Sequence, residues 1–276
     1  MESIPKIIHY CWFGGNPIPE ELQKCIESWS ILDSYQVMKW DESNCSFNEN
    51  EYIRKAFAEK KPSFMSDYYR IKALYEYGGI YFDTDVKVCK SFDALLQYPA
   101  FLNFIFDCSV GSAIVGAKPA NPFIKAILDM YNATTFCDNN IKKTFQYNQE
   151  KLYVQKFETN NYYFTYYILK NYPDFVLNNK FQDMGDFVIF PKEYFEIGTL
   201  TNKHYALHLC AGDWRLKTDD KHTLKNRFKK ILSKYPFIFD KLQIVIRKRR
   251  YNKLNKEIPF YEYYLAQKEK RQTPEL

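Results

Sequence analysis

Residues 66–85 read SDYYRIKALYEYGGIYFDTD. The first part of this stretch predicts a helix over residues 63–77, because its apolar residues recur every three or four positions and share one face. The glycine pair 78–79 ends the helix, since glycine favours the backbone conformations of turns. The apolar residues 80–82 then predict a short buried strand, which ends at the acidic triplet 83–85.

Helix-like and strand-like segments alternate on both sides of this stretch. Buried strands are expected at 4–13, 35–40, 86–88, 101–106, 112–117, 187–190 and 205–209. Helices are expected at 19–30, 49–60 and 122–131. The aromatic and Asn-rich region 135–173 gives no clear boundaries. Strands that alternate with helices indicate an α/β fold with a mostly parallel sheet and helices on both of its faces.

Length and composition narrow the class of protein. A chain of 276 residues with 46% hydrophobic content has room for one large domain, or for one domain with an appendage. Disorder of the whole chain is therefore excluded. The 24 Tyr and 23 Phe, against only 9 Gly, also exclude collagen-like and linker-like chains. We expect a packed, aromatic-rich globular protein.

The apolar runs are too short to cross a membrane. The longest, residues 101–106 and 237–246, fall well short of the roughly 20 residues that a bilayer requires. The first residues carry Glu2 and Lys6 and no small-residue cleavage site, so a secretory signal is not expected. Seven cysteines without a CxxC pair argue against a disulfide framework and against a zinc ribbon. These features predict a cytoplasmic protein with reduced cysteines.

Charge divides the chain into an acidic body and a basic C-terminal segment. Residues 216–276 contain 17 Lys and Arg and 7 Asp and Glu, a net charge of +10, which leaves a net charge of −4 on residues 1–215. We therefore expect one domain over 1–215 and a basic helical segment over 216–276. Within that segment, an apolar stripe over 224–235 predicts a helix that ends at Pro236.

Two interpretations of the basic segment remain open, and a third is disfavoured. It suits the surface of an anionic membrane, where each nearby cation contributes about 1 kcal/mol and aromatic rings sit at headgroup depth. It suits equally a helical lobe whose cations are only solvated. Nucleic-acid binding is not expected, because no recognisable nucleic-acid motif accompanies the charge.

Asp83 and Asp85 are the strongest candidates for a ligand site. They directly follow an apolar strand, and open α/β sheets bind ligands beyond the carboxyl ends of their strands. Carboxylate oxygens there suit Mg²⁺ or Mn²⁺ that also binds phosphate oxygens, which predicts a metal-diphosphate site. Asp67 and Arg70 share one helix face and are placed to contact sugar or phosphate oxygens. The alternatives are an acidic turn and a simple ion pair on the helix surface.

Three segments resemble glycosyltransferase family 32. That family groups sugar transferases with an Asp-x-Asp (DXD) motif, including yeast mannosyltransferases and bacterial capsule enzymes. Residues 66–85 and the opening IPKIIHYCWFGG at 4–15 carry the closest resemblance. ALHLCAGDW at 206–214 is similar to the late His…Ser-Trp element of the family. These segments also look like the catalytic core of the large clostridial glucosylating toxins.

The resemblance implies a GT-A-type fold, a nucleotide-sugar donor and a divalent cation, Mn²⁺ or Mg²⁺. It places Asp83, Asp85 and His208 around the cation. It assigns donor binding to Trp12, Asp67, Arg70, Tyr81, Asp83 and Trp214, and catalysis to Asp67, Arg70, Asp83 and Asp85. Trp12 would stack on the base, since an aromatic face contributes about 1–3 kcal/mol with any base. The alternative for Trp12 is an ordinary core tryptophan.

Two positions depart from the family pattern. Asp213 stands where relatives usually have Ser, and a carboxylate near a diphosphate is repulsive unless it faces the metal or a cation such as Lys217. Residues 111–113 occupy a place where relatives often carry an Asn near the acceptor, so we assign no residue to that role. His9 matches the opening motif, but we expect it to be structural.

The resemblance implies a retaining, metal-dependent hexosyltransferase. Because no nucleophile is visible in the sequence, we expect the leaving phosphate to help deprotonate the acceptor hydroxyl. UDP-galactose or UDP-glucose is the expected donor, with GDP-mannose second. The expected acceptor is an oligosaccharide, in particular a lipid-diphosphate-linked saccharide of bacterial capsule or surface polysaccharide synthesis, at the inner face of the plasma membrane. The alternatives are a transferase that modifies a protein and a non-catalytic binding protein.

Overall fold

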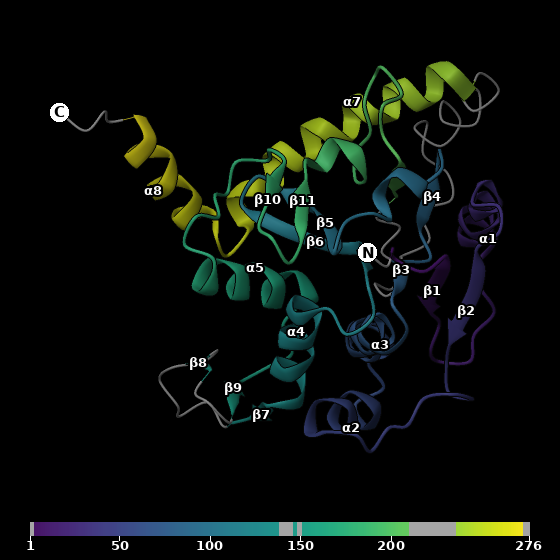
Figure 1. The fold of residues 1–276 in the computed structure, drawn as a ribbon, viewed down its shortest axis with the longest axis vertical. Helices are drawn as coiled ribbons and strands as arrows, with labels where there is room; N and C mark the ends of the chain where they lie inside the picture. The colour runs from purple at the N-terminus through teal and green to yellow at the C-terminus, as the bar shows by residue number, and fades with distance from the viewer. Residues whose placement is uncertain (1–2, 138–145, 148–150, 210–235, 273–276) are drawn as a thin grey trace, which may run out of the picture.

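A seven-stranded sheet forms the centre of the molecule (Figure 1). The computed structural model describes residues 3–137, 146–147, 151–209 and 236–272. In spatial order the strands are β10 (Gln182–Asp183), β11 (Val188–Phe190), β5 (Ala100–Phe106), β6 (Ser109–Ala117), β3 (Gly79–Phe82), β1 (Ile7–Cys11) and β2 (Gln36–Trp40). Five of these strands run in one direction, and β6 and β10 run the opposite way. The predicted α/β fold with a mostly parallel sheet is confirmed.

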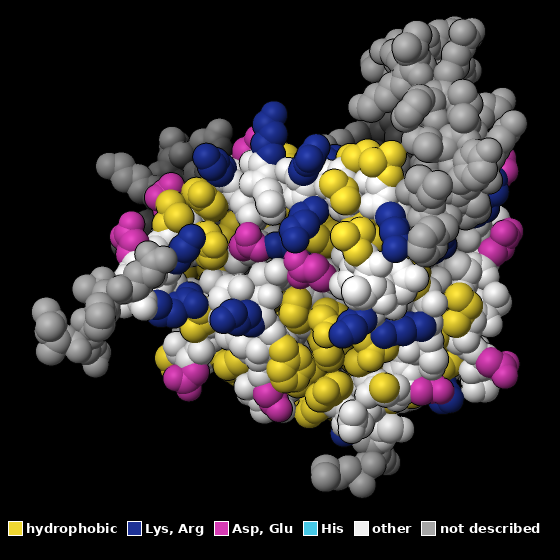
Figure 2. Space-filling view, turned by 90° about the horizontal axis from the view of Figure 1, so that it is seen from above, with side chains coloured by type: hydrophobic (Ala, Val, Ile, Leu, Met, Phe, Trp, Pro, Cys, Tyr) yellow, Lys and Arg dark blue, Asp and Glu magenta, His cyan; other side chains and the backbone are white. Residues whose placement is uncertain are grey.

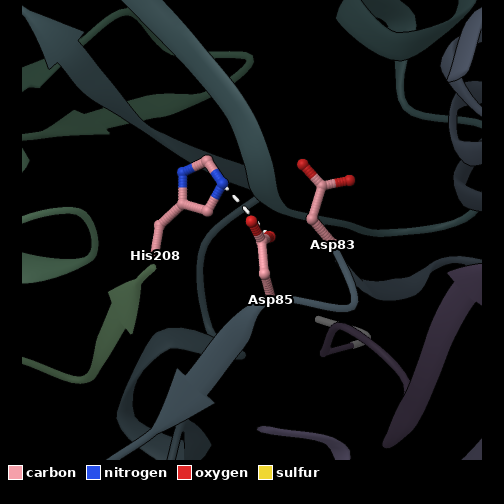
Figure 3. Close-up of side chains that lie close together, drawn as sticks. All are labelled: Asp83, Asp85 and His208. Atoms are coloured by element: carbon pink, nitrogen blue, oxygen red, sulfur yellow. Dashed lines mark ion pairs between the residues drawn. The ribbon is translucent and has the colours of Figure 1, made fainter. Parts of the chain in front are cut away.

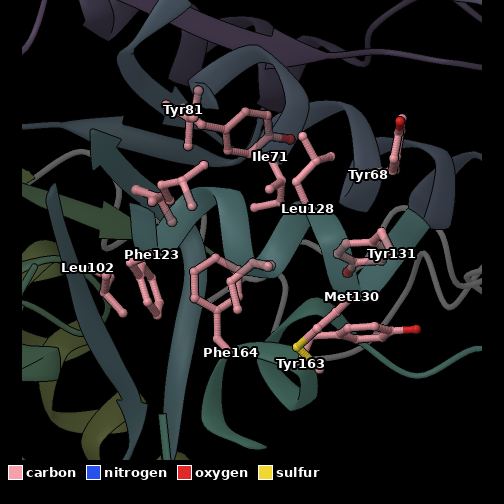
Figure 4. Close-up of a cluster of buried hydrophobic side chains, with 14 of the residues drawn as sticks. Tyr68, Ile71, Tyr81, Leu102, Phe123, Leu128, Met130, Tyr131, Tyr163 and Phe164 are labelled. Atoms are coloured by element: carbon pink, nitrogen blue, oxygen red, sulfur yellow. The ribbon is translucent and has the colours of Figure 1, made fainter. Parts of the chain in front are cut away.

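Helices cover one face of the sheet and build the larger core. They are α2 (Glu51–Ala58), α3 (Pro62–Tyr77), α4 (Pro122–Asn132) and α5 (Asn160–Asn171). Their apolar side chains pack against strand residues such as Tyr81 and Leu102 (Figure 4). Burial of these side chains supplies the main driving force for folding on this face.

The other face of the sheet carries a second core. It is covered by α1 (Glu20–Glu27), the 3₁₀ helices η1 (Ser28–Ile31), η2 (Asp93–Leu95) and η3 (Lys192–Tyr194), and a two-stranded sheet of β4 (Val86–Val88) and β12 (Ala206–His208). Ile80 and Phe82 of β3 belong to this core, whereas Tyr81 between them belongs to the larger one. Successive residues of β3 thus point to opposite faces, as the pleat of a strand requires.

Two glycines connect α3 to β3. Pro62 begins α3 at a position where its missing N–H costs nothing, and Gly78 ends the helix with φ +63°. A Cβ atom on Gly79 would lie 2.6 Å from the carbonyl oxygen of Ile7, so β3 approaches β1 this closely only with glycine there. The helix therefore ends, and the strand begins, where the sequence predicts.

The region without predicted boundaries contains a small sheet and a helix. The sheet consists of β7 (Thr134–Phe136), β9 (Leu152–Val154) and β8 (Gln146–Tyr147), and α5 follows it. The sequence of α5, NNYYFTYYILKN, has aromatic and aliphatic residues around most of the helix. Its hydrophobic residues therefore show no clear helical period, and the helix could not be predicted from periodicity.

Residues 236–272, the described portion of the C-terminal segment, are largely helical, as expected. This portion contains α7 (Pro236–Leu254), η4 (Asn255–Glu257) and α8 (Tyr261–Gln272). The helix expected over 224–235 and the domain boundary expected after residue 215 lie outside the described residues. Within the described part of the chain, no helix combines the length and the apolar character needed to cross a bilayer.

Candidate active site

Asp83, Asp85 and His208 converge beside the edge of the central sheet (Figure 3). Asp83 follows β3, Asp85 precedes β4, and His208 ends β12, whose pairing with β4 places His208 opposite Val86. One ligand atom from each of the three side chains lies within 4.8 Å of the other two. Nε2 of His208 is 3.2 Å from Oδ1 of Asp85. The structure thus brings together the three residues that the sequence assigns to a metal.

Backbone hydrogen bonds fix the acidic turn. The N–H of Asp83 donates to the carbonyl oxygen of Ala113 over 2.8 Å, which ties the turn to β6. The N–H of Leu209 donates to the carbonyl oxygen of Asp85 over 2.9 Å, which ties the turn to the end of β12. Both carboxylates therefore extend from a backbone that is held on two sides.

Arg70 holds Asp83 from the side of α3. Its Nη2 lies 3.0 Å from Oδ1 of Asp67 and 3.2 Å from Oδ1 of Asp83, and its Nη1 donates to the carbonyl oxygen of Ser112 over 2.8 Å. The hydroxyl of Tyr81 donates to the same Oδ1 of Asp83 over 3.0 Å, and the guanidinium lies 4.5 Å from the centre of the Tyr81 ring. Four of the predicted donor-site residues therefore form one network.

Burial and charge oppose each other in this network. Burial raises the pKa of the Asp67 carboxyl to about 7, although the Arg70 guanidinium and a hydrogen bond from the Asn160 backbone act to lower it. Burial also raises the pKa of Asp83, again against the charge of Arg70. Burial acts to lower the pKa of Arg70, but the charges of Asp83, Tyr81 and Asp67 outweigh it and leave the pKa raised. The guanidinium thus offsets part of the free-energy cost of burying these two carboxylates.

Glu196 holds His208 from the opposite side. This glutamate is fully buried, and its Oε2 lies 2.7 Å from Nδ1 of His208. Because a carboxylate accepts hydrogen bonds, Nδ1 carries a proton, and Nε2 is the ring nitrogen that faces Asp85. Asn103 donates to the other oxygen of Glu196 over 3.1 Å, and the Tyr251 hydroxyl from α7 donates to Oε2 over 3.3 Å. Neutral histidines that bind metals commonly have this arrangement.

Sequence reasoning missed Glu196 and Tyr251. Neither residue lies in a recognisable motif, and they are 12 residues before and 43 residues after His208 in the chain. The one available signal was Glu196 itself, a charged residue placed between the apolar residues Phe195 and Ile197. Pairing of β4 with β12 and packing of α7 bring these distant residues to the site.

Trp12 lies at the same edge of the sheet as the acidic turn. It directly follows β1, which pairs in parallel with β3, the strand that leads into Asp83. The side chain is half-buried, and its Nε1 donates to the carbonyl oxygen of Asn16 over 2.6 Å. It is therefore not enclosed in the core, and stacking on a base stays a prediction.

The remaining sequence-based candidates have different outcomes. Trp214, with Asp213 and Lys217, lies outside the described residues. His9 is fully buried between Gly78 and Trp40, with its Nε2 2.7 Å from the Gly78 carbonyl oxygen. Burial lowers the pKa of His9, which is in accord with the structural role expected for it.

A DXD turn at the carboxyl end of a strand, with a histidine facing its second carboxylate, is the arrangement that the resemblance to DXD sugar transferases predicts. Residues 19–102 match the family described as the glycosyltransferase sugar-binding region containing DXD motif. The matched residues include Asp67, Arg70 and both aspartates of the turn. The predicted resemblance to DXD glycosyltransferases is confirmed.

Two yeast proteins are similar to this chain over nearly half of its length. Inositol phosphoceramide mannosyltransferase 3 of Schizosaccharomyces pombe is 32% identical over 136 residues, which cover 46% of this chain and 36% of that protein. Mannosyl phosphorylinositol ceramide synthase CSH1 of Saccharomyces cerevisiae is 33% identical over 135 residues, covering 46% and 35%. The similarity thus spans about a third of each relative.

Two solved structures of glycosyltransferases overlap loosely with this one. PaToxG glycosyltransferase has a TM-score of 0.40 at 20% identity and covers 47% of this chain and 60% of its own. A glycosyltransferase involved in the glycosylation of the major capsid of PBCV-1 has a TM-score of 0.39 at 13% identity and covers 75% and 96%. Strand order and packing, and not these overlaps, define the fold of this chain.

Proposed function

We propose that this chain transfers a hexose from a nucleotide-diphosphate sugar to an acceptor hydroxyl, with a divalent cation held by Asp83, Asp85 and His208. The observation that carries this proposal is the convergence of these three side chains within a region that matches a DXD sugar-binding family. Retention of the anomeric configuration belongs to the proposal and is supported by the resemblance to family 32.

The three side chains fit a divalent cation by their chemistry. Two carboxylates and one imidazole, with Nε2 of His208 facing Asp85, suit Mn²⁺ and also Mg²⁺ bound with water and phosphate oxygens. When bound, the cation would neutralise negative charge on the departing diphosphate. Glu196 keeps the proton on Nδ1 of His208, so that the ring does not have to change its tautomer when a cation binds.

Arg70 and Asp67 orient the donor side of the site. The ion pairs of Arg70 with Asp67 and Asp83 fix the Asp83 carboxylate, and the Tyr81 hydroxyl donates to the same oxygen. The second oxygen of each carboxylate is then positioned for a sugar or ribose hydroxyl, which is a hydrogen-bond donor. Such fixed partners contribute to transfer by holding the donor in one geometry.

Mannose, galactose and glucose are the sugars to test. The names of both yeast relatives contain a mannosyl group, which supports a mannosyl donor such as GDP-mannose. The sequence context of Trp12 favours UDP-galactose or UDP-glucose. Because mannose and galactose each differ from glucose in the orientation of one hydroxyl group, selection of the sugar depends on a few hydrogen bonds in the pocket.

A lipid-borne acceptor is the substrate that the relatives support best. The names of the two yeast relatives contain inositol phosphoceramide in one case and mannosyl phosphorylinositol ceramide in the other, and both are lipids. A lipid acceptor implies that the site works at a membrane surface. The narrower expectation of a lipid-diphosphate-linked saccharide in capsule or surface polysaccharide synthesis stays a prediction.

The outer side of α7 has the side chains that membrane contact requires. Leu242, Val245 and Ile246 are exposed on its first half, with Ile246 48% exposed. Residues 241–256 contain seven Lys and Arg and no Asp or Glu. Figure 2, which looks down on the side where α7 lies, shows apolar and cationic side chains interleaved on this surface. We include in the proposal that this side contacts an anionic membrane.

Vesicle binding tests this part of the proposal. The triple variant R249Q/R250Q/K253Q should bind vesicles that contain phosphatidylglycerol about 100-fold more weakly, because each cation contributes about 1 kcal/mol at an anionic surface. The matched control K60Q/K156Q/K170Q changes the net charge by the same amount at exposed lysines outside α7. It should bind as the wild type does. Equal binding by both triple variants would remove α7 from the proposal.

Donor hydrolysis tests the catalytic part. With Mn²⁺, the wild-type chain should release nucleoside diphosphate from at least one of GDP-mannose, UDP-galactose and UDP-glucose. Asp85→Ala should lower that rate at least about 100-fold, since removing one group that stabilises transition-state charge typically costs this much. Asp174→Ala, which changes an exposed aspartate, serves as the control. Equal hydrolysis by Asp85→Ala and the wild type would contradict the proposal.

A further inference from the structure

The inner side of α7 packs beside Glu196, the residue that holds His208. Ile244 is 5% exposed and Tyr251 is 4% exposed. A Cβ atom on Gly198 would lie 3.2 Å from Cγ1 of Ile244 and 2.5 Å from Cδ2 of Leu207. The backbone at Gly198 therefore packs closely against both α7 and β12. Further along the same helix, the Tyr251 hydroxyl reaches Glu196, the carboxylate that holds His208. These contacts place α7 directly beside the candidate metal site.

Arg247 projects from this same side of α7. It follows Ile244 by three residues and precedes Tyr251 by four, a spacing that puts all three on one helix face. Its Nη1 is buried and has no hydrogen-bond partner in the part of the chain that the structure describes. Buried donors are nearly always satisfied, and an unpaired one lowers stability. This unpaired guanidinium donor beside the candidate site is therefore suited to bind an anion.

The charge of Arg247 acts on the same region as the charge of Asp85. The pKa of the Cys25 thiol in α1 is raised to about 11, chiefly by burial and in part by the charge of Asp85. The charges of Lys87 and Arg247 act on the same thiol in the opposite direction. Arg247 and Asp85 are therefore both within electrostatic range of one point on α1.

An anion at this place has a clear chemical class. Asp83 and Asp85 are themselves anionic, so an anion can approach them only together with a cation or with a positive side chain. A diphosphate bound to a cation on these carboxylates would still carry negative charge. A guanidinium suits phosphate because its parallel N–H groups match two phosphate oxygens.

We infer that Arg247 of α7 binds the diphosphate group of a nucleoside diphosphate or nucleotide sugar at this site. The inference rests on the proposed function, because it takes the ligand from there. With this contact, α7 contributes to the donor site in two ways. Tyr251 supports His208 through Glu196, and Arg247 contacts the diphosphate. α7 is then part of the active site and does more than pack against it.

Calorimetric titration of the full chain tests this inference. With Mn²⁺ present, UDP and GDP are titrated into the wild type and into Arg247→Gln, with uridine, guanosine and inorganic pyrophosphate as partial ligands. Arg247→Gln should bind the nucleoside diphosphate and pyrophosphate about 10- to 100-fold more weakly, which is the loss expected for one charge-assisted interaction. Nucleoside binding should not change. Arg247→Lys should be intermediate, because it keeps the charge and loses the paired donors.

Arg54→Gln is the matched control, since Arg54 is an exposed arginine on α2. Its affinity for nucleoside diphosphate should equal that of the wild type. Thermal unfolding without ligand gives a second readout: Arg247→Met should be at least as stable as the wild type, because it removes an unpaired buried donor. A purely structural arginine would instead lose stability and keep its nucleotide affinity.

The outcomes separate this inference from the proposed function. If the wild type binds a nucleoside diphosphate and Arg247→Gln binds it equally well, the assignment of Arg247 is wrong and the proposed function stands. A drop in stability of Arg247→Met without a change in affinity has the same meaning. If the wild type binds neither UDP nor GDP at any accessible concentration, the proposed function fails and takes this inference with it.

Discussion

The two aspartates of the DXD turn are held by different parts of the chain. Asp83 is held from within residues 66–85, by Arg70, which also pairs with Asp67, and by Tyr81. Asp85 faces His208, which is held by Glu196 and, through it, by Tyr251. The first arrangement, which we call the local half, comes from 20 consecutive residues. The second, the distant half, exists only when β12 and α7 have packed.

The two halves should respond differently to mutation. The local half is a buried ion-pair network, so loss of its one guanidinium leaves carboxylates without compensation. The distant half is a chain of hydrogen bonds to one imidazole, so its variants should affect cation binding more than folding. Substitutions in each half therefore separate a folding defect from a binding defect.

Arg70→Met should lower the free energy of unfolding by about 3–5 kcal/mol at neutral pH, since removing one partner of a buried ion pair leaves its carboxylates unpaired. Urea denaturation monitored by circular dichroism measures this. Arg54→Met, at an exposed position on α2, should change the stability by less than about 0.5 kcal/mol. Equal effects of the two substitutions would show that the local half is not a buried network.

Glu196→Gln should weaken Mn²⁺ binding about 10- to 100-fold while the chain remains folded, because the amide no longer fixes the proton on Nδ1 of His208. Titration of Mn²⁺ followed by electron paramagnetic resonance measures the affinity. Glu193→Gln, three residues earlier in η3, is the control. Unchanged affinity in Glu196→Gln would separate this glutamate from the metal site.

The Asp67 carboxyl should make stability depend on pH. Its pKa of about 7 lies above the ordinary value of 3.8, so the folded state binds more protons than the unfolded state between these values. Stability contributed by this group is present at low pH and is lost as pH rises towards 7, by up to about 2 kcal/mol between pH 5 and pH 7.

Asp67→Asn should remove this part of the slope. Urea denaturation of the metal-free wild type and of the variant, each at pH 5 and pH 7, provides the comparison. A steeper loss of stability with rising pH in the variant would mean that Arg70 keeps Asp67 ionised throughout and that the predicted sign of the pH dependence is wrong.

Tyr251→Phe should have the smallest effect. It removes one hydrogen bond of 3.3 Å to Glu196, and a typical hydrogen bond contributes about 1 kcal/mol. We expect Mn²⁺ affinity to fall about 5-fold, less than in Glu196→Gln. A larger loss in Tyr251→Phe than in Glu196→Gln would show that α7 acts on the site by another route.

The same contrast explains how much of the molecule was predictable from its sequence. The turn from α3 through Gly78 and Gly79 to the acidic triplet could be predicted, because periodicity, glycine chemistry and motif all lie in one short segment. Most strands and helices of the first 132 residues were predictable for the same reason, since each shows its own hydrophobic period.

The rest depended on contacts between distant segments. Nothing local to Glu196 or Tyr251 marks them as partners of His208, because their role arises from strand pairing and helix packing. Arg247 in the sequence is one of four consecutive cations, 247–250, and only burial of its Nη1 distinguishes it from its neighbours. α5 could not be predicted because its aromatic and aliphatic residues lie around most of the helix and show no single apolar face.

Joint binding of one divalent cation by Asp83, Asp85 and His208 underlies the whole proposal. The sharpest test is titration of Mn²⁺ into the wild type, Asp85→Asn and His208→Ala in the presence of GDP or UDP, with free Mn²⁺ measured by electron paramagnetic resonance. We predict one bound ion per wild-type chain and loss of that ion in both variants. Undiminished binding in both variants, or no nucleotide-dependent binding in the wild type, would contradict the shared cation site.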